Sequence, residues 1–112
     1  MKFILPLISL FLVFNLNVFS QTDVKTIVKI ANELIEQNNY EAALEKFDEA
    51  LDYLPSYAPA LDGKSNLMIL MGRYKDGGKL IEKAIEKNSD YAPYYLTRGK
   101  INVLKEKLSD MK

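Results

Sequence analysis

The sequence predicts an all-α fold, an α-solenoid of antiparallel helix pairs in which two repeats are followed by a further helix. The first observation is an internal repeat, since Tyr57-Ala58-Pro59 recurs 34 positions later as Tyr91-Ala92-Pro93. The second is that apolar residues recur at the i, i+3, i+4, i+7 spacing of one buried helical face. Repeats of this length, each made of two helices, stack on their neighbours and share a continuous core.

The first twenty residues have the layout of a secretory signal peptide. A lysine supplies the positive start, an apolar run follows over residues 3–14, and the small residue Ser20 ends a more polar stretch. We expect cleavage between Ser20 and Gln21, which removes residues 1–20. The alternative is an uncleaved membrane anchor, but a spanning helix needs about 20 apolar residues and this run is shorter and contains Pro6.

This segment predicts an exported protein, periplasmic or secreted, that belongs to a bacterial cell envelope. Contact with a membrane is expected only through the N-terminal segment, and only if that segment stays uncleaved.

Residues 24–57 form the first predicted repeat. Its first helix has apolar side chains on one face, at Ile27, Ile30, Ala31, Leu34 and Ile35. Asn38-Asn39 ends that helix, since asparagine suits turns and left-handed backbone. A second apolar stripe follows at Tyr40, Ala43, Leu44, Phe47, Ala50 and Leu51. Pro55 ends the second helix, because proline cannot continue a helix and disfavours α geometry in the residue before it.

Residues 58–91 form the second predicted repeat, with the same layout. Pro59 lies where a proline in the first turn is tolerated, and Gly72 suits a helix C-terminus. The apolar contacts between these two positions come from Leu61, Leu67, Met68 and Met71. The next helix is predicted over residues 74–87, and turn-prone residues follow it at 88–90.

Residues 92–112 have two interpretations that the sequence leaves open. A helix over residues 92 to about 106 is predicted in both. It is either a cap with a polar outer face, which a solenoid needs at its end, or the first helix of a third repeat. In the second interpretation, Leu108-Ser109-Asp110-Met111 begins a further helix.

A 34-residue period built from a helix pair resembles the tetratricopeptide repeat (TPR) family. In the first repeat the family's signature positions carry Ile27, Ile30, Ala31, Leu34, Tyr40, Ala43, Phe47, Ala50 and Pro55. In the second repeat they carry, matched by size, Leu61, Ser65, Met68, Gly72, Tyr74, Gly77, Ile81 and Ala84, and a third repeat opens with Tyr95 and Gly99. Lys64 departs from the pattern, because the family has an apolar residue there. The alternative is an unrelated bundle of four or five helices, which the shared 34-residue offset disfavours.

The resemblance implies a superhelix whose concave groove, lined by the first helix of each repeat, binds a partner. The groove positions that carry over to the first repeat are Lys25, Val28, Asn32, Ile35 and Glu36. Those of the later helices are Asp62, Asn66, Ile69, Leu70, Leu96, Lys100, Val103 and Leu104. Several are apolar, which favours an amphipathic helix or an extended apolar peptide of another protein as the ligand. The alternative is that these residues only contact neighbouring helices or a further segment.

One TPR subclass binds the carboxylate tail of a chaperone through Lys, Asn and Arg at fixed groove positions. Asn32 and Asn66 fit that pattern. The remaining positions carry Val28, Gly63, Pro93 and Thr97. This kind of binding is therefore not expected.

The composition excludes several kinds of chemistry. With no Cys and no His, the chain has no thiol nucleophile, no imidazole base and no zinc site of the usual N/S type. No metal and no other cofactor are expected. With 15 basic and 15 acidic side chains, it lacks the basic excess typical of nucleic-acid binders. The acidic residues are scattered over helix surfaces rather than gathered for catalysis.

The sequence thus predicts a protein–protein interaction adaptor or scaffold of the cell envelope, and not an enzyme. Two alternatives stay open. In one, the chain is the N-terminal part of a larger TPR scaffold, in which these repeats pack onto later ones. The other, of a different class, is a small hydrolase or a sugar-binding module.

Overall fold

The computed structural model describes residues 23–111, and all its regular structure is helical. The first described helix covers residues 23–36. It is followed by α2 (Tyr40–Tyr53), α3 (Ala58–Leu70), α4 (Tyr74–Lys87) and α5 (Ala92–Asp110). The all-α prediction is confirmed. The predicted signal peptide lies outside the described residues, and none of the helices within 23–111 is long and apolar enough to cross a membrane.

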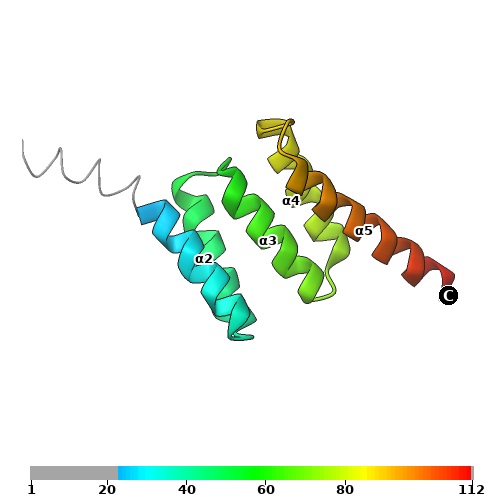
Figure 1. Cartoon of the computed structure of the whole chain (residues 1–112). Helices are drawn as coiled ribbons and strands as arrows, with labels where there is room; N and C mark the ends of the chain where they lie inside the picture. The colour runs from blue at the N-terminus through cyan, green and yellow to red at the C-terminus, as the bar shows by residue number, and fades with distance from the viewer. Residues whose placement is uncertain (1–22, 112) are drawn as a thin grey trace, which may run out of the picture.

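The helices form two layers of sequential antiparallel pairs (Figure 1). Helix 23–36, α3 and α5 lie in one layer, and α2 and α4 lie behind them. α3 packs most extensively against α4, and it also contacts α2 and α5. This is the arrangement that the 34-residue period predicts.

Local signals end helix 23–36, α2 and α3 where the sequence predicts. Helix 23–36 stops before Asn38, whose φ of 60° is left-handed. α2 stops two residues before Pro55, and Gly72, with a φ of 77°, follows the end of α3. Prolines occupy the first turn of both α3 and α5. Each of these residues acts on its own neighbourhood, and so the helix ends can be predicted without tertiary information.

α3 is buried on two opposite sides, because it contributes to both apolar cores. The first core joins helix 23–36, α2 and α3, and its buried residues are Val24, Ile27, Val28, Ala31, Ala43, Phe47, Ala50, Ala60, Leu67 and Met68. The second joins α3, α4 and α5 through Leu61, Ile81, Ala84, Ile85, Tyr94 and Ile101. A helix covered on two sides has no single apolar stripe, which explains why the apolar residues of α3 are spaced irregularly.

Small residues let the helices approach closely. Ser65 is fully buried in α3, and its hydroxyl donates a 2.7 Å hydrogen bond to the backbone oxygen of Gly77 in α4. Gly63 plays a comparable part toward α2, since a methyl group placed on it would overlap the ring of Phe47. Sequence analysis names Gly63 only at a carboxylate-binding position and does not predict this packing role, because the role depends on the orientation of a ring from another repeat.

An ion pair also recurs with the 34-residue period. Lys64 of α3 lies 2.7 Å from Asp48 of α2, and Arg98 of α5 lies 3.5 Å from Glu82 of α4. Both pairs are partly exposed, and such pairs contribute about 0–1 kcal/mol. The pairing accounts for the charged residue at position 64, where the family pattern has an apolar one.

α5 is longer than predicted. It runs without interruption to Asp110, so Leu108 and Ser109 continue this helix and do not begin another. The physical reason is that no glycine or proline follows Gly99 to end it. The C-terminal half of α5 projects beyond α4 (Figure 1).

Candidate functional site

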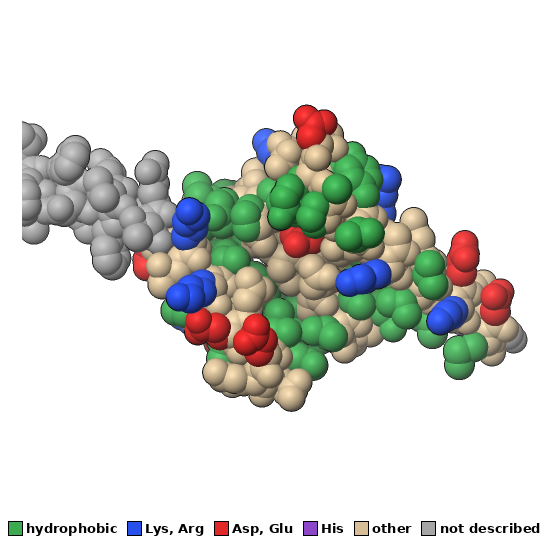
Figure 2. Space-filling view, viewed as in Figure 1, with side chains coloured by type: hydrophobic (Ala, Val, Ile, Leu, Met, Phe, Trp, Pro, Cys, Tyr) green, Lys and Arg blue, Asp and Glu red, His purple; other side chains and the backbone are tan. Residues whose placement is uncertain are grey.

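The predicted groove residues lie on the layer formed by helix 23–36, α3 and α5, which we call the front layer. Figure 2 shows this face, with hydrophobic side chains along it and Lys or Arg side chains spaced among them. Most of the predicted groove residues fall into three groups. The first two each lie between two helices, and the third lies on one helix alone.

The first group lines a hollow of about 450 Å³ between helix 23–36 and the start of α3. Val28 is nearly buried and belongs to the first core. Asn32 is exposed beside it, and Tyr57 and Pro59 close the other side. The predicted residues Lys25 and Glu36 line the same hollow, as do Lys29 and Glu33, which sequence analysis did not select. This hollow combines an apolar floor with a charged rim.

The second group is a polar cluster between α3 and α5. The Thr97 hydroxyl donates a 3.1 Å hydrogen bond to Asp62 Oδ1, and the Asn66 side-chain amide donates a 3.3 Å hydrogen bond to the same oxygen. The Asn66 amide also donates to the Asp62 backbone oxygen at 3.0 Å. The other carboxylate oxygen, Oδ2, accepts no hydrogen bond within residues 23–111, so it is available to a donor of a partner.

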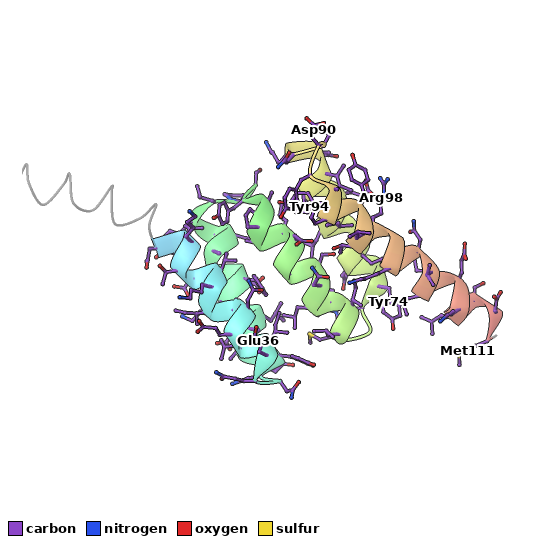
Figure 3. All side chains as sticks on the ribbon, viewed as in Figure 1. Glu36, Tyr74, Asp90, Tyr94, Arg98 and Met111 are labelled. Carbon is purple, nitrogen blue, oxygen red and sulfur yellow. The ribbon has the colours of Figure 1, made fainter. Side chains whose placement is uncertain are left out.

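Burial raises the pKa of the Asp62 carboxyl. The hydrogen bonds from Thr97 and Asn66 and the positive charge of Lys100 act in the opposite direction, but desolvation outweighs them. Burial also raises the pKa of Tyr94, and the negative charge of Asp62 adds to that shift. Tyr94 points from α5 toward α3 in Figure 3, in keeping with its place in the second core.

The raised pKa of Asp62 predicts a specific pH dependence. The folded state holds this proton more tightly than the unfolded state, so the contribution of Asp62 to stability is fully present below its ordinary pKa. It is lost as the pH rises through the folded-state pKa. We expect Asp62→Asn, which keeps the acceptor oxygen, to gain stability relative to the parent between acidic and neutral pH. The gain should be at most about 1 kcal/mol, because the carboxyl is partly exposed and screened by solvent.

The measurement is urea unfolding of both proteins across that pH range, followed by helical circular dichroism. Only the difference between parent and variant is informative, since the other carboxylates titrate in both. A difference that stays constant with pH, or that changes in the opposite direction, would contradict a raised pKa.

The third group lies on α5 alone. Leu96 is 69 % exposed and Val103 is 52 % exposed, and Lys100 lies between them on the helix. Together with Tyr95, Gly99 and Leu104 they line a shallow hollow of about 550 Å³. No helix covers this side of α5 among the described residues.

The remaining predicted groove residues lie outside these groups. Ile35 packs against the first core and Ile69 against the second, so each presents only part of its side chain to the front layer. Leu70, near the end of α3, is 52 % exposed and lines neither hollow.

Sequence analysis names Thr97 only as a departure from the carboxylate-binding pattern, and it does not predict the hydrogen bond of Thr97 to Asp62. It lies on the buried side of α5 together with Tyr94 and Ile101, at helical spacing. A polar residue within an apolar stripe needs a hydrogen-bond partner, and this signal was present in the sequence. Its partner is not readable from the sequence, because Asp62 belongs to another helix.

The polar side chains of this site are arranged to donate and accept hydrogen bonds. Within residues 23–111, no group of three or more Asp and Glu side chains is arranged to hold a metal ion. Asp62 is fixed by two neutral donors, and no nucleophile paired with a base accompanies it among the interactions described above.

Two comparisons bear on this geometry. Residues 34–101, more than half of the chain, match a protein-family model described as tetratricopeptide repeat. The match runs from the end of helix 23–36 to Ile101 in α5, and so it includes the polar cluster. None of the curated proteins compared with the sequence matches it.

Proposed function

The chain belongs to the tetratricopeptide repeat family, and from this premise we propose that it is an adaptor or scaffold of a bacterial cell envelope. In this proposal it binds a helix or peptide segment of another protein along its front layer. Domains of this family are generally protein–protein interaction modules and are typically non-catalytic.

The exposure of aliphatic side chains on the front layer carries the proposal. Leu70, Leu96 and Val103 are each at least half exposed there, on two neighbouring helices. Exposed apolar surface bordered by polar residues often marks a protein interaction site. The free oxygen of Asp62 and the amide of Asn32 add groups that can orient a bound backbone or side chain.

The cell-envelope part of the proposal rests on the N-terminal segment. Residues 1–20 have the order of a signal peptide, with a positive start, an apolar middle and a small residue at the end. Periplasmic or secreted location follows from that order. The intact mass of the protein purified from its native host tests this part, because cleavage leaves a chain that begins at Gln21.

The groove is tested by a double variant, Asn32→Glu with Leu70→Glu. Both side chains are exposed, so neither change removes core packing. Chemical crosslinking in the native host identifies the proteins captured by the tagged parent chain, and binding to each captured protein is then measured directly. We expect the variant to weaken binding of the partner by about tenfold or more, which corresponds to about 1.4 kcal/mol.

The matched control is Lys79→Ala with Lys83→Ala in α4. It changes the net charge by the same amount, but on the layer behind, at two exposed positions. All three proteins must show the same helicity and melting temperature. If the α4 control weakens binding as much as the front-layer variant does, or if neither weakens it, the partner does not bind in the groove.

A further inference from the structure

One face of α5 stands open where the two earlier front-layer helices are covered by the second helix of their own repeat. In the first repeat, Ile27 and Ala31 are buried in the core that α2 completes. In the second, Leu61 and Ser65 are buried against α4, and the Ser65 hydroxyl bonds to the α4 backbone. The equivalent positions of α5 are Tyr95 and Gly99.

These two residues are open to solvent. Tyr95 is exposed, and no atom lies within 4 Å of a methyl group placed on Gly99. On one side of them the surface continues to Leu96 and Val103, which border the groove. We call the four residues Tyr95, Leu96, Gly99 and Val103 the open face of α5.

Tyr95 is the best-anchored side chain of the open face. The Tyr95 hydroxyl donates a 2.7 Å hydrogen bond to the Ser89 backbone oxygen, and the Arg98 guanidinium lies 4.8 Å from the centre of the Tyr95 ring. Arg98 also forms an ion pair with Glu82. The Tyr95 ring therefore has contacts that favour its position beside Gly99.

The charge around the open face is positive. α5 carries four basic and two acidic side chains, and of the two cations next to Gly99 in the sequence, Arg98 is paired with Glu82 while no salt bridge involves Lys100 among the described residues. A second copy of this chain, paired through the same face, would bring these cations close to their own counterparts, which is unfavourable. A helix rich in carboxylates would instead be attracted.

We propose that the open face of α5 binds an acidic amphipathic helix of another protein, which packs at Gly99 as α2 packs at Ala31. The occupant presents a small residue to Gly99, a large apolar residue beside Tyr95, and carboxylates to Lys100 and its neighbours. This surface shares Leu96 and Val103 with the front-layer surface of the proposed function, and Tyr95 and Gly99 extend it to the side of α5 away from Asp62. The proposal does not require the groove around Asp62 to be functional.

α2 itself is the model for such a helix, because it covers the equivalent face two repeats earlier. Its sequence has one basic and five acidic side chains, whereas α4, which has the same structural role, has four basic and three acidic ones. Labelled 14-residue peptides with these two sequences are therefore probes of opposite net charge. They also differ in helix propensity, because α4 has Gly77 and Gly78 where α2 has Ala43 and Leu44, so the effect of salt identifies the part of the difference that charge causes.

The experiment measures the fluorescence anisotropy of each peptide with the full-length chain at low ionic strength. We expect the α2 peptide to bind about tenfold more tightly than the α4 peptide, and added salt to reduce that difference. Gly99→Glu should weaken binding of the α2 peptide by about tenfold or more, because it fills the notch and repels carboxylates. Ser109→Glu adds the same charge to α5 away from the open face and should leave binding nearly unchanged.

Several results would overturn the proposal. Equal binding of the two peptides would show that the open face does not select for negative charge. Unchanged binding to Gly99→Glu would show that the peptide does not bind at the open face. If only the Asn32→Glu, Leu70→Glu variant loses peptide binding, the peptide binds in the groove and not at the open face. If the parent chain forms a dimer that Gly99→Glu dissociates, the occupant of the open face is a second copy of the chain. If the peptide binds only after residues 1–20 are removed, the occupant is that segment.

Discussion

A Phe47→Ala variant is expected to lose about 3–5 kcal/mol of unfolding free energy, the typical cost of truncating a buried aromatic side chain. Phe47 is fully buried in the first core, where its ring fills the space that Gly63 leaves open. Because small domains are stable by only about 5–15 kcal/mol, the loss of that ring removes a large fraction of the stability of this one. Urea unfolding followed by circular dichroism measures the loss.

The control is Tyr53→Ala, which removes a large aromatic side chain from the same helix. Tyr53 is mostly exposed, so we expect a change within about 0.5 kcal/mol. If the two variants lose similar amounts, or if Phe47→Ala loses less than about 1 kcal/mol, the ring does not hold the two repeats together.

Alanine at Gly63 and at Gly99 should change stability in opposite directions. In a helix interior, glycine costs about 1 kcal/mol relative to alanine, so both substitutions gain this amount from the backbone. At Gly99 no atom is near, and the variant should be stabilised by about 0.5–1 kcal/mol.

At Gly63 the new methyl group would overlap the buried ring of Phe47. Overpacking of this kind costs about 1–3 kcal/mol, and after the backbone gain of about 1 kcal/mol the net result should be a destabilisation of up to about 2 kcal/mol. Thermal and urea unfolding of the two variants measure the difference between them, which should be up to about 3 kcal/mol. Stabilisation of both variants would mean that Phe47 and Gly63 are not in contact. In that case, adding Phe47→Leu to Gly63→Ala would restore no stability.

Much of the groove could be predicted as a set of helix positions, but not as a surface. The 34-residue period places Asp62, Leu96 and Lys100 on first helices of their repeats, and the structure puts all three on the front layer. Their exposure differs widely, because each helix has a different set of neighbours. Val28 is nearly buried and Leu96 is largely exposed, although both occupy the same position of the repeat.

The residues that were missed share one property. The packing role of Gly63 depends on Phe47, and the hydrogen bond of Thr97 depends on Asp62. Each partner is 16 or more residues away in the sequence. The charged residue at position 64 likewise has its explanation in Asp48 of the preceding helix. Contacts of this kind depend on how two helices pack, and a period alone does not specify which side chains meet.

The sequence by itself determined the extent of most helices and their antiparallel pairing. These follow from signals that act locally or recur at a fixed interval, such as Pro55, Pro59 and Gly72 and the apolar spacing around Phe47. Only the tertiary structure decided that α3 is buried on both sides, that a polar cluster joins α3 to α5, and that one face of α5 stays open. The physical reason is that the burial of a side chain depends on two helices, since a side chain is covered only when another helix lies against it.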